Sequence, residues 1–264
     1  MTYCVGIEVD EGLVFAADTR TNASLDDVRV HRKLHAFEYP GERVFVVMTS
    51  GNLATTQLAI SCLRRDAEDP SAPRSLRTFA HLFEAAAYVG EVLVASQVRA
   101  SEGEHHHGIS TQATLIFGGQ IAGERPGLYM IYPLGNCISA SPETPYLQIG
   151  ESKYGKPILD RIVRPDTALE DAARCALVSL DSTIRSNLSV GLPVDLALVR
   201  AGDLRISQQM RMDAGNALYA DIHANWSRKL EHAVRTLPRF PWETPLDDAD
   251  AEPARPRDGH PERS

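Results

Sequence analysis

The fold is decided by the stretch Thr2-Tyr3-Cys4-Val5-Gly6-Ile7-Glu8-Val9-Asp10-Glu11-Gly12-Leu13-Val14-Phe15-Ala16-Ala17-Asp18. Apolar residues occupy every second position from 3 to 9, which is typical of a β-strand. Residues 10–12 carry a turn signal, and residues 13–17 form a second short apolar strand. The sequence therefore predicts a β-hairpin, and folding the chain back at its turn places Asp18 close to Thr2.

The rest of the chain is predicted to form groups of strands and groups of helices. Further strands are predicted at 30–38, 43–49, 112–118, 128–132, 146–149, 194–200 and 204–210. Helices are predicted at 53–65, 75–100, 152–161, 168–185 and 217–235. This order lacks the strict βαβ alternation of a doubly wound sheet. It favours an α+β fold, with two mainly antiparallel sheets packed face to face and helices on both outer faces.

We expect one domain over residues 1–235, followed by a Pro-rich, charged tail over 236–264. The distal part of the tail, from about residue 244, has too few apolar residues to fold alone and is predicted to be disordered. The net charge of −8 argues against nucleic acid or an anionic membrane as a partner. No apolar run is long enough to cross a membrane, and no secretory signal is evident. The four cysteines are scattered, so we expect a reducing, cytoplasmic location.

Thr2 has the chemistry of a nucleophile if Met1 is removed. A threonine hydroxyl needs a base at neutral pH, and a free α-amine on the same residue can serve as one. Lys33 is the candidate cation that would lower the pKa of this amine, and Asp18 is the candidate carboxylate partner of Lys33. Gly51 lies at a strand-to-helix break, where a backbone N–H can face a developing oxyanion. Taken singly, Thr2 suits a strand end, Asp18 suits a turn at a strand end, and Lys33 suits a solvated charge.

Four segments together resemble the landmarks of proteasome β-type subunits, which are N-terminal-nucleophile hydrolases. The segments are Thr2, Ala16-Ala17-Asp18-Thr19-Arg20, Arg32-Lys33-Leu34 and Thr49-Ser50-Gly51-Asn52. Within that family the start Met1-Thr2-Tyr3-Cys4-Val5-Gly6-Ile7, the segment 18–23 and the C-terminal extension most resemble the bacterial Anbu (ancestral β-subunit) branch. The resemblance covers about residues 2–235.

The resemblance implies a four-layered αββα sandwich and a threonine-type endopeptidase or amide hydrolase. It implies Thr2 as nucleophile, Lys33 as the pKa-lowering cation, Asp18 as its carboxylate and the Gly51 N–H as oxyanion donor. It also implies a homo-oligomer in the form of a ring or helical stack, and a peptide substrate. No nucleotide-binding motif is present, so any ATP-dependent unfoldase would be a separate, unidentified chain. No cofactor and no metal are expected.

The residues that support the site depart from the family pattern. Glu151, in Gly150-Glu151-Ser152, stands where the family has the serine of a Gly-Ser-Gly segment. In the stretch 185–190, Ser189 is retained, but Ser186 stands where the family has an aspartate. These departures leave open a weak or inactive structural ring subunit. A small-molecule N-terminal-nucleophile amidase is a further alternative, although such enzymes more often present Cys or Ser.

Two other features suggest chemistry less strongly. The run Glu104-His105-His106-His107 contains metal-binding residue types, but consecutive histidines do not share one helix face, so a polar loop is the better interpretation. Cys4 lies close to the nucleophile in sequence and is interpreted as a small packing residue of the first strand.

Overall fold

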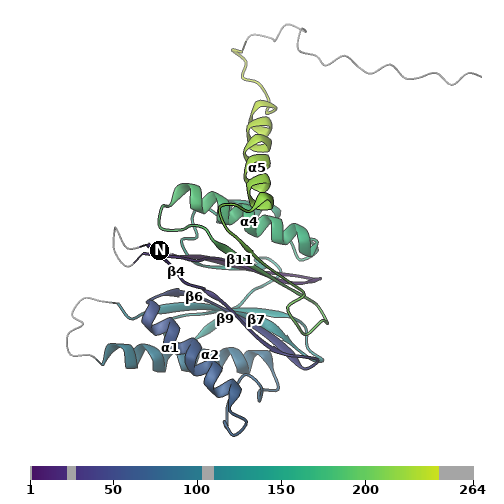
Figure 1. The fold of residues 1–264 in the computed structure, drawn as a ribbon. Helices are drawn as coiled ribbons and strands as arrows, with labels where there is room; N and C mark the ends of the chain where they lie inside the picture. The colour runs from purple at the N-terminus through teal and green to yellow at the C-terminus, as the bar shows by residue number, and fades with distance from the viewer. Residues whose placement is uncertain (1, 23–27, 103–109, 244–264) are drawn as a thin grey trace, which may run out of the picture. The chain divides into compact units, whose positions relative to one another are not determined.

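The computed structural model describes residues 2–22, 28–102 and 110–243. The chain forms a mixed α/β structure of helices and antiparallel sheets (Figure 1). Its strands are β1 (Tyr3–Val9), β2 (Gly12–Asp18), β3 (Arg20–Asn22), β4 (Val28–Val30), β5 (Leu34–Tyr39), β6 (Arg43–Gly51), β7 (Ala113–Ile121), β8 (Gly127–Ile131), β9 (Cys137–Ser139), β10 (Tyr146–Gly150), β11 (Val194–Arg200) and β12 (Gln208–Met212). Its helices are α1 (Leu53–Glu68), α2 (Leu82–Ser101), α3 (Lys156–Ile162), α4 (Leu169–Ser186) and α5 (Ala217–Arg235).

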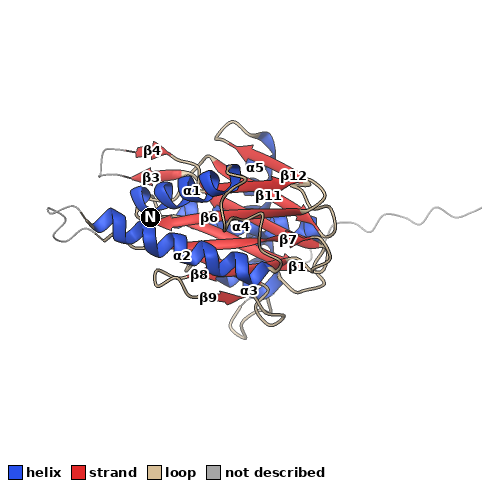
Figure 2. Cartoon of the chain, turned by 90° about the horizontal axis from the view of Figure 1, so that it is seen from below, coloured by secondary structure: helices blue, strands red, loops and turns tan. Residues whose placement is uncertain are grey.

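Two five-stranded sheets form the centre of the molecule. One has the strand order β10-β1-β2-β11-β12, and the other has the order β5-β6-β7-β8-β9. Strands β3 and β4 pair only with each other and form a separate two-stranded ribbon (Figure 2). The predicted hairpin is the pair β1–β2, with Cys4 opposite Ala17. This register brings the start of β1 beside the end of β2, as the turn at residues 10–12 requires.

Alternate side chains of each sheet enter two different apolar cores. One face of β1 and β2 packs against α3 and α4, with Val5 and Ile7 among the buried residues. The opposite face, with Phe15, meets the second sheet at residues such as Val46. The other face of the second sheet packs against α1 and α2, for example through Phe45. In Figure 1 the order is therefore α1 and α2, the β6 sheet, the β11 sheet, and α4. Because both faces of the central strands are buried, strands such as β1, β2 and β6 are largely apolar throughout.

Contacts divide the chain into one compact unit over Met1–Trp226 and a second over Ser227–Ser264. The boundary falls inside α5, earlier than the residue 235 expected from the sequence. In the second unit the rings of Phe240 and Trp242 stack with their centroids 4.6 Å apart. The predicted disorder from residue 244 concerns a segment outside the described residues. Over the described ranges, no helix combines the length and the apolar character needed to cross a membrane.

The predicted start of the second helix was wrong because local polar groups compete with the regular structure. The helix predicted at 75–100 begins only at Leu82. Before it, Ser75 and Thr78 form a turn in which the Ser75 N–H donates to Thr78 Oγ1 over 3.0 Å. The His81 N–H donates to Glu84 Oε2 over 3.2 Å, and this contact fixes the start of the helix.

The strand predicted at 30–38 is also interrupted. Its start belongs to β4, residues 31–33 leave the strand conformation, and β5 begins at Leu34. The strand predicted at 204–210 is shifted to β12, after Leu204 with its φ of +49°. The short strand β9 has no counterpart in the prediction, and the helix predicted from residue 152 begins at Lys156.

Candidate active site

Asp18 ends strand β2 and is completely buried. Its Oδ1 accepts the Tyr3 N–H over 3.0 Å, a contact that follows from the β1–β2 register. Its Oδ2 accepts the N–H groups of Arg20 over 3.2 Å and Gly191 over 3.3 Å. Burial raises the pKa of the Asp18 carboxyl, while Lys33 and the backbone donors oppose this rise. The carboxylate thus has several fixed partners, as a buried charge requires.

Lys33 lies in the break between β4 and β5 and is 5% exposed. Its Nζ donates to Asp18 Oδ1 and to the Arg20 carbonyl oxygen, both over 2.6 Å. Its own carbonyl accepts the Thr49 N–H over 3.0 Å, which ties this segment to the end of β6. The Asp18 carboxylate of one sheet therefore binds the Lys33 ammonium, and the hydrogen bond from Thr49 attaches the Lys33 backbone to the other sheet.

Thr2 lies immediately before β1 and is half-buried. Its carbonyl oxygen accepts the Glu151 N–H over 2.7 Å. Gly150, at the end of β10, has a φ of +85°, and a Cβ at this position would lie 1.9 Å from the Thr2 carbonyl oxygen. Only glycine has both the left-handed backbone and the space that this close approach requires. The start of β1 is thus held against the end of β10.

Gly51 ends β6 with a φ of +109°. A Cβ on Gly51 would lie 2.5 Å from the Gln112 carbonyl oxygen, so a side chain does not fit. The next residue, Asn52, caps α1 by accepting the Thr55 N–H over 3.1 Å. The positive end of the α1 dipole therefore adjoins Gly51, which favours negative charge at this point.

Three of the four predicted site residues meet at one cavity of about 330 Å³. Thr2, Lys33 and Gly51 all line it, and Asp18 lies behind Lys33 as its ion-pair partner. The remaining lining residues are Thr21, Thr49, Ser50, Leu53, Thr56 and Gly150. A hydroxyl, an ammonium and the N-terminal end of a helix thus border one space. This arrangement can accommodate a carbonyl group and stabilise a negative charge on its oxygen.

The predicted supporting residues are not part of the cavity lining. Glu151 Oε2 accepts the Asn187 side-chain amide over 3.1 Å, and Asn187 Oδ1 accepts the Ser189 N–H over 2.9 Å. These bonds hold the loop that also presents the Gly191 N–H to Asp18. Ser186 is the exposed last residue of α4. Glu151 and Ser189 therefore both contact Asn187 in this loop, whereas Ser186 is exposed at the end of α4.

Several residues at the site were not singled out from the sequence. The Arg20 carbonyl accepts from Lys33, while the Arg20 guanidinium donates to the Leu188 carbonyl over 2.8 Å. Asn187 links Glu151 to the loop, and Gly150, which has no side chain, leaves space for the Thr2 carbonyl oxygen. The Gly150-Glu151 pair was the available signal for Gly150. A backbone carbonyl such as that of Arg20 leaves no signal in a sequence.

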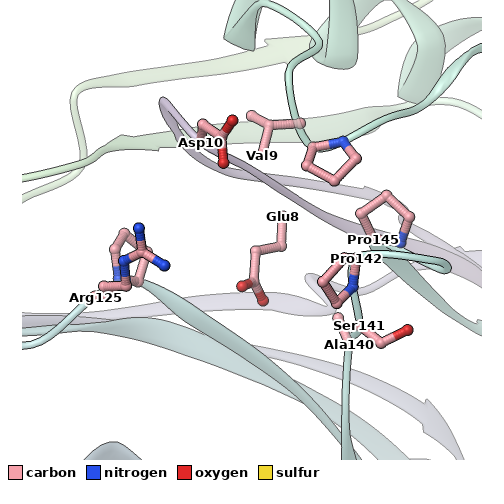
Figure 3. A pocket seen from close by; sticks show the side chains of 10 residues that line it. Glu8, Val9, Asp10, Arg125, Ala140, Ser141, Pro142 and Pro145 are labelled. Carbon is pink, nitrogen blue, oxygen red and sulfur yellow. The ribbon is translucent and has the colours of Figure 1, made fainter.

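A second cavity, of about 370 Å³, lies by the other end of β1 (Figure 3). Glu8, Asp10 and Arg125 line it together with proline rings, and Figure 3 shows the Glu8 side chain reaching toward its middle. Its lining includes the hydroxyl of Ser141 but not Thr2, so the predicted N-terminal-nucleophile chemistry does not fit there. Cys4 is completely buried between the sheets, and burial raises the pKa of its thiol, in keeping with a packing role.

Among the described residues, no group of three or more His, Cys, Asp or Glu side chains is arranged to hold a metal ion. The run at 104–107, the sequence feature closest to a metal motif, lies outside the described residues.

Comparison with solved structures identifies the relatives of this chain. Anbu (ancestral beta-subunit) from Yersinia bercovieri shares 44% identity over 90% of this chain and 99% of its own, with a TM-score of 0.85. The chain belongs to the Anbu family. The Anbu complex from Pseudomonas aeruginosa, described as a helical assembly, shares 46% identity over 91% of this chain and 98% of its own, with a TM-score of 0.86. Anbu from Hyphomicrobium sp. strain MC1 shares 41% identity over 90% and 99%, with a TM-score of 0.82.

These matches confirm the resemblance noted in the sequence. Anbu is a family of proteasome-like β-subunits related to the N-terminal-nucleophile hydrolases. No protein-family model matches the chain, and no curated protein matches it.

Proposed function

We propose that this Anbu protein is a threonine-type peptidase whose nucleophile is Thr2 after removal of Met1. The observation that carries the proposal is the shared cavity of Thr2, Lys33 and Gly51, with Asp18 paired to Lys33 over 2.6 Å. A free α-amine has an ordinary pKa of about 7.7–8.0. The nearby ammonium lowers this pKa, so that the amine is neutral and accepts a proton near pH 7.

The reaction follows from these positions. The Thr2 α-amine takes the hydroxyl proton, directly or through a water, while Oγ attacks the peptide carbonyl. The Gly51 N–H and the positive end of α1 stabilise the tetrahedral oxyanion. The protonated α-amine then gives its proton to the leaving amine, and an ester remains on Thr2. Water, deprotonated by the same amine, releases the acyl group and restores the hydroxyl.

The proposal includes the architecture and assembly expected of this enzyme class. The two double-faced sheets and their outer helices suit the four-layered αββα sandwich of N-terminal-nucleophile hydrolases. The helical assembly of the Pseudomonas aeruginosa relative supports a homo-oligomeric ring or helical stack for this chain. We infer a peptide substrate and a cytoplasmic location, and any ATP-dependent unfoldase that serves the site would be a separate chain.

The decisive test measures the intact mass of the purified protein and its reaction with a small β-lactone. The expected result is loss of Met1 and one lactone adduct on Thr2. Thr2→Ala should abolish the adduct, and Thr2→Ser should retain it. Retention of Met1 on most chains would contradict the proposal.

An inactive structural ring subunit remains the second candidate function. The observation in its favour is the exposed position of Ser186, where the family carries an aspartate, and the attachment of Glu151 to Asn187 instead of to the cavity. A folded oligomer that has lost Met1 but does not react with the lactone would favour this candidate.

A further inference from the structure

A third cavity, of about 470 Å³, adjoins the cavity of Thr2. The two share Thr49, Leu53 and Thr56 as walls. A substrate whose carbonyl lies at Thr2 would therefore have a side chain beside this third cavity. The chemistry of its lining then decides which side chain is favoured.

The lining of the third cavity is basic. Of its ten residues, Arg32, Arg64, His31 and His35 are basic and none is a carboxylate. The whole chain carries a net charge of −8, so a cavity lined by one sign of charge is a local exception to its overall balance. Such a cavity attracts anionic groups.

The Arg64 side chain packs on an aromatic ring, and the residues on both sides of Arg32 are anchored. The guanidinium carbon of Arg64 lies 5.5 Å from the centre of the Phe37 ring, over which it stacks. Side chains on a helix lean toward its N-terminus, so Arg64 on α1 leans back in the direction of Thr56. Arg32 is flanked by His31, whose N–H donates to the Thr19 carbonyl over 2.9 Å, and by the anchored Lys33.

Neighbouring charges leave this basic character in place. Burial, Arg64 and Arg32 lower the pKa of His35 to about 4, so His35 is neutral at pH 7. Burial raises the pKa of Asp195. Arg211, which lies 3.6 Å from Asp195, opposes this rise more strongly than Arg32 does. The lining therefore presents two guanidinium groups to whatever enters.

We propose that this cavity selects substrates with an acidic side chain, glutamate or aspartate, at the residue whose carbonyl Thr2 attacks (P1). Guanidinium groups bind carboxylates through two parallel hydrogen bonds, which gives both charge and shape preference. This inference rests on the proposed function, because the cavity selects a substrate only if Thr2 is the nucleophile.

The test uses the full chain in its native oligomer with peptide vinyl sulfones that differ only in P1, which is Glu, Gln or Leu. We expect the second-order rate of Thr2 modification to be about tenfold or more higher for Glu than for Gln, as loss of one good charged contact would cost. Arg64→Gln should reduce this Glu/Gln ratio, and R32Q/R64Q should bring it close to one.

Arg65→Gln is the matched control. Arg65 is the next residue on the same helix, its guanidinium lies 2.7 Å from Asp66, and it does not line the cavity. The ratio should keep its wild-type value in this variant. A wild-type ratio near one, or an equal fall in Arg65→Gln and Arg64→Gln, would overturn the inference.

A small β-lactone without any P1 side chain separates the two proposals. Lactone labelling of Thr2 without a preference for P1 Glu rejects the acidic-substrate inference and leaves the peptidase proposal standing. Absence of lactone labelling rejects both.

Discussion

Lys33 Nζ lies 2.6 Å from Asp18 Oδ1, and the two side chains are 6% and 0% exposed. This pair joins the two sheets, because Asp18 ends β2 and Lys33 precedes β5. Its Lys33 side chain also lines the cavity of Thr2, so a change in the pair affects both the packing of the sheets and the candidate site. A buried ion pair contributes little net stability by itself, but removal of one partner leaves an uncompensated charge.

Lys33→Met is therefore expected to destabilise the protein by about 3–5 kcal/mol, because Asp18 would lose its cation in a buried site. It should also slow β-lactone labelling of Thr2 at neutral pH, because the α-amine would return toward its ordinary pKa. Denaturant unfolding measures the first effect, and the pH profile of labelling measures the second.

Two further variants separate these effects. In K33M/D18N the buried charge is absent, so part of the stability should return while labelling stays slow. Lys33→Arg keeps a cation but is bulkier, and it should fold better than Lys33→Met. If Lys33→Met labels at the wild-type rate with an unchanged pH profile, Lys33 does not control the amine.

Asn187 provides a test of the loop behind the site. Its side chain donates to Glu151 and accepts the Ser189 N–H, and it keeps the loop next to Asp18. Asn187→Ala is expected to cost about 1 kcal/mol for each hydrogen bond lost and to slow Thr2 labelling. Ser186→Ala, at the exposed neighbouring position, should stay within about 0.5 kcal/mol of wild type. Equal effects in both variants would contradict a positioning role for Asn187.

The hairpin and most of the helices could be predicted from the sequence because their signals are local. Alternation over residues 3–9, a turn at residues 10–12 and a short apolar run at residues 13–17 are sufficient to define β1 and β2. The start of α2 was predicted too early because Leu76 and Phe79 continue the helical spacing, whereas the Ser75–Thr78 turn ends it. The interruption at residues 31–33 follows from tertiary contacts of Lys33, which no local pattern contains.

For the candidate site, the sequence predicted the charged partners better than the backbone that holds them. Asp18 lies near Thr2 because the hairpin is short, and this could be deduced from residue positions alone. The approach of β10 to Thr2 could not, because β1 and β10 are separated by most of the first unit. The basic cavity next to Thr2 combines residues 31–35 with one face of α1, which requires the packed structure.

His35 should make the folded protein sensitive to acid. Its pKa is lowered to about 4, chiefly by burial and then by Arg64 and Arg32, from an ordinary value near 6.5. Between these two pH values the unfolded chain binds a proton that the folded chain does not, so stability falls as the pH drops from about 6.5 to about 4. At about 1.4 kcal/mol per pKa unit, the loss over this window amounts to about 3–4 kcal/mol.

Denaturant unfolding at a series of pH values measures this loss. His35→Gln should flatten the dependence in that window, because the variant lacks the imidazole whose pKa differs between the folded and unfolded chains. His31→Gln, in the same cavity, keeps His35 and should keep the slope. A slope in His35→Gln equal to that of wild type would assign the acid sensitivity to other groups.

Gly150 supplies the sharpest test of the position of Thr2, because the chain contains a control with the same backbone. Gly150 and Gly123 both have a φ of +85°, but a Cβ on Gly150 would lie 1.9 Å from the Thr2 carbonyl, whereas a Cβ on Gly123 meets nothing within 4 Å. Gly123→Ala should cost only the left-handed strain of about 1–2 kcal/mol. Gly150→Ala carries the same strain and must also push Thr2 away from its place. A displacement of about 1 Å can reduce reactivity by roughly a hundredfold. We therefore expect Thr2 labelling to collapse in Gly150→Ala and to persist in Gly123→Ala, as measured by intact mass after lactone treatment. Similar labelling in the two variants would mean that the contact between β10 and Thr2 does not position the nucleophile.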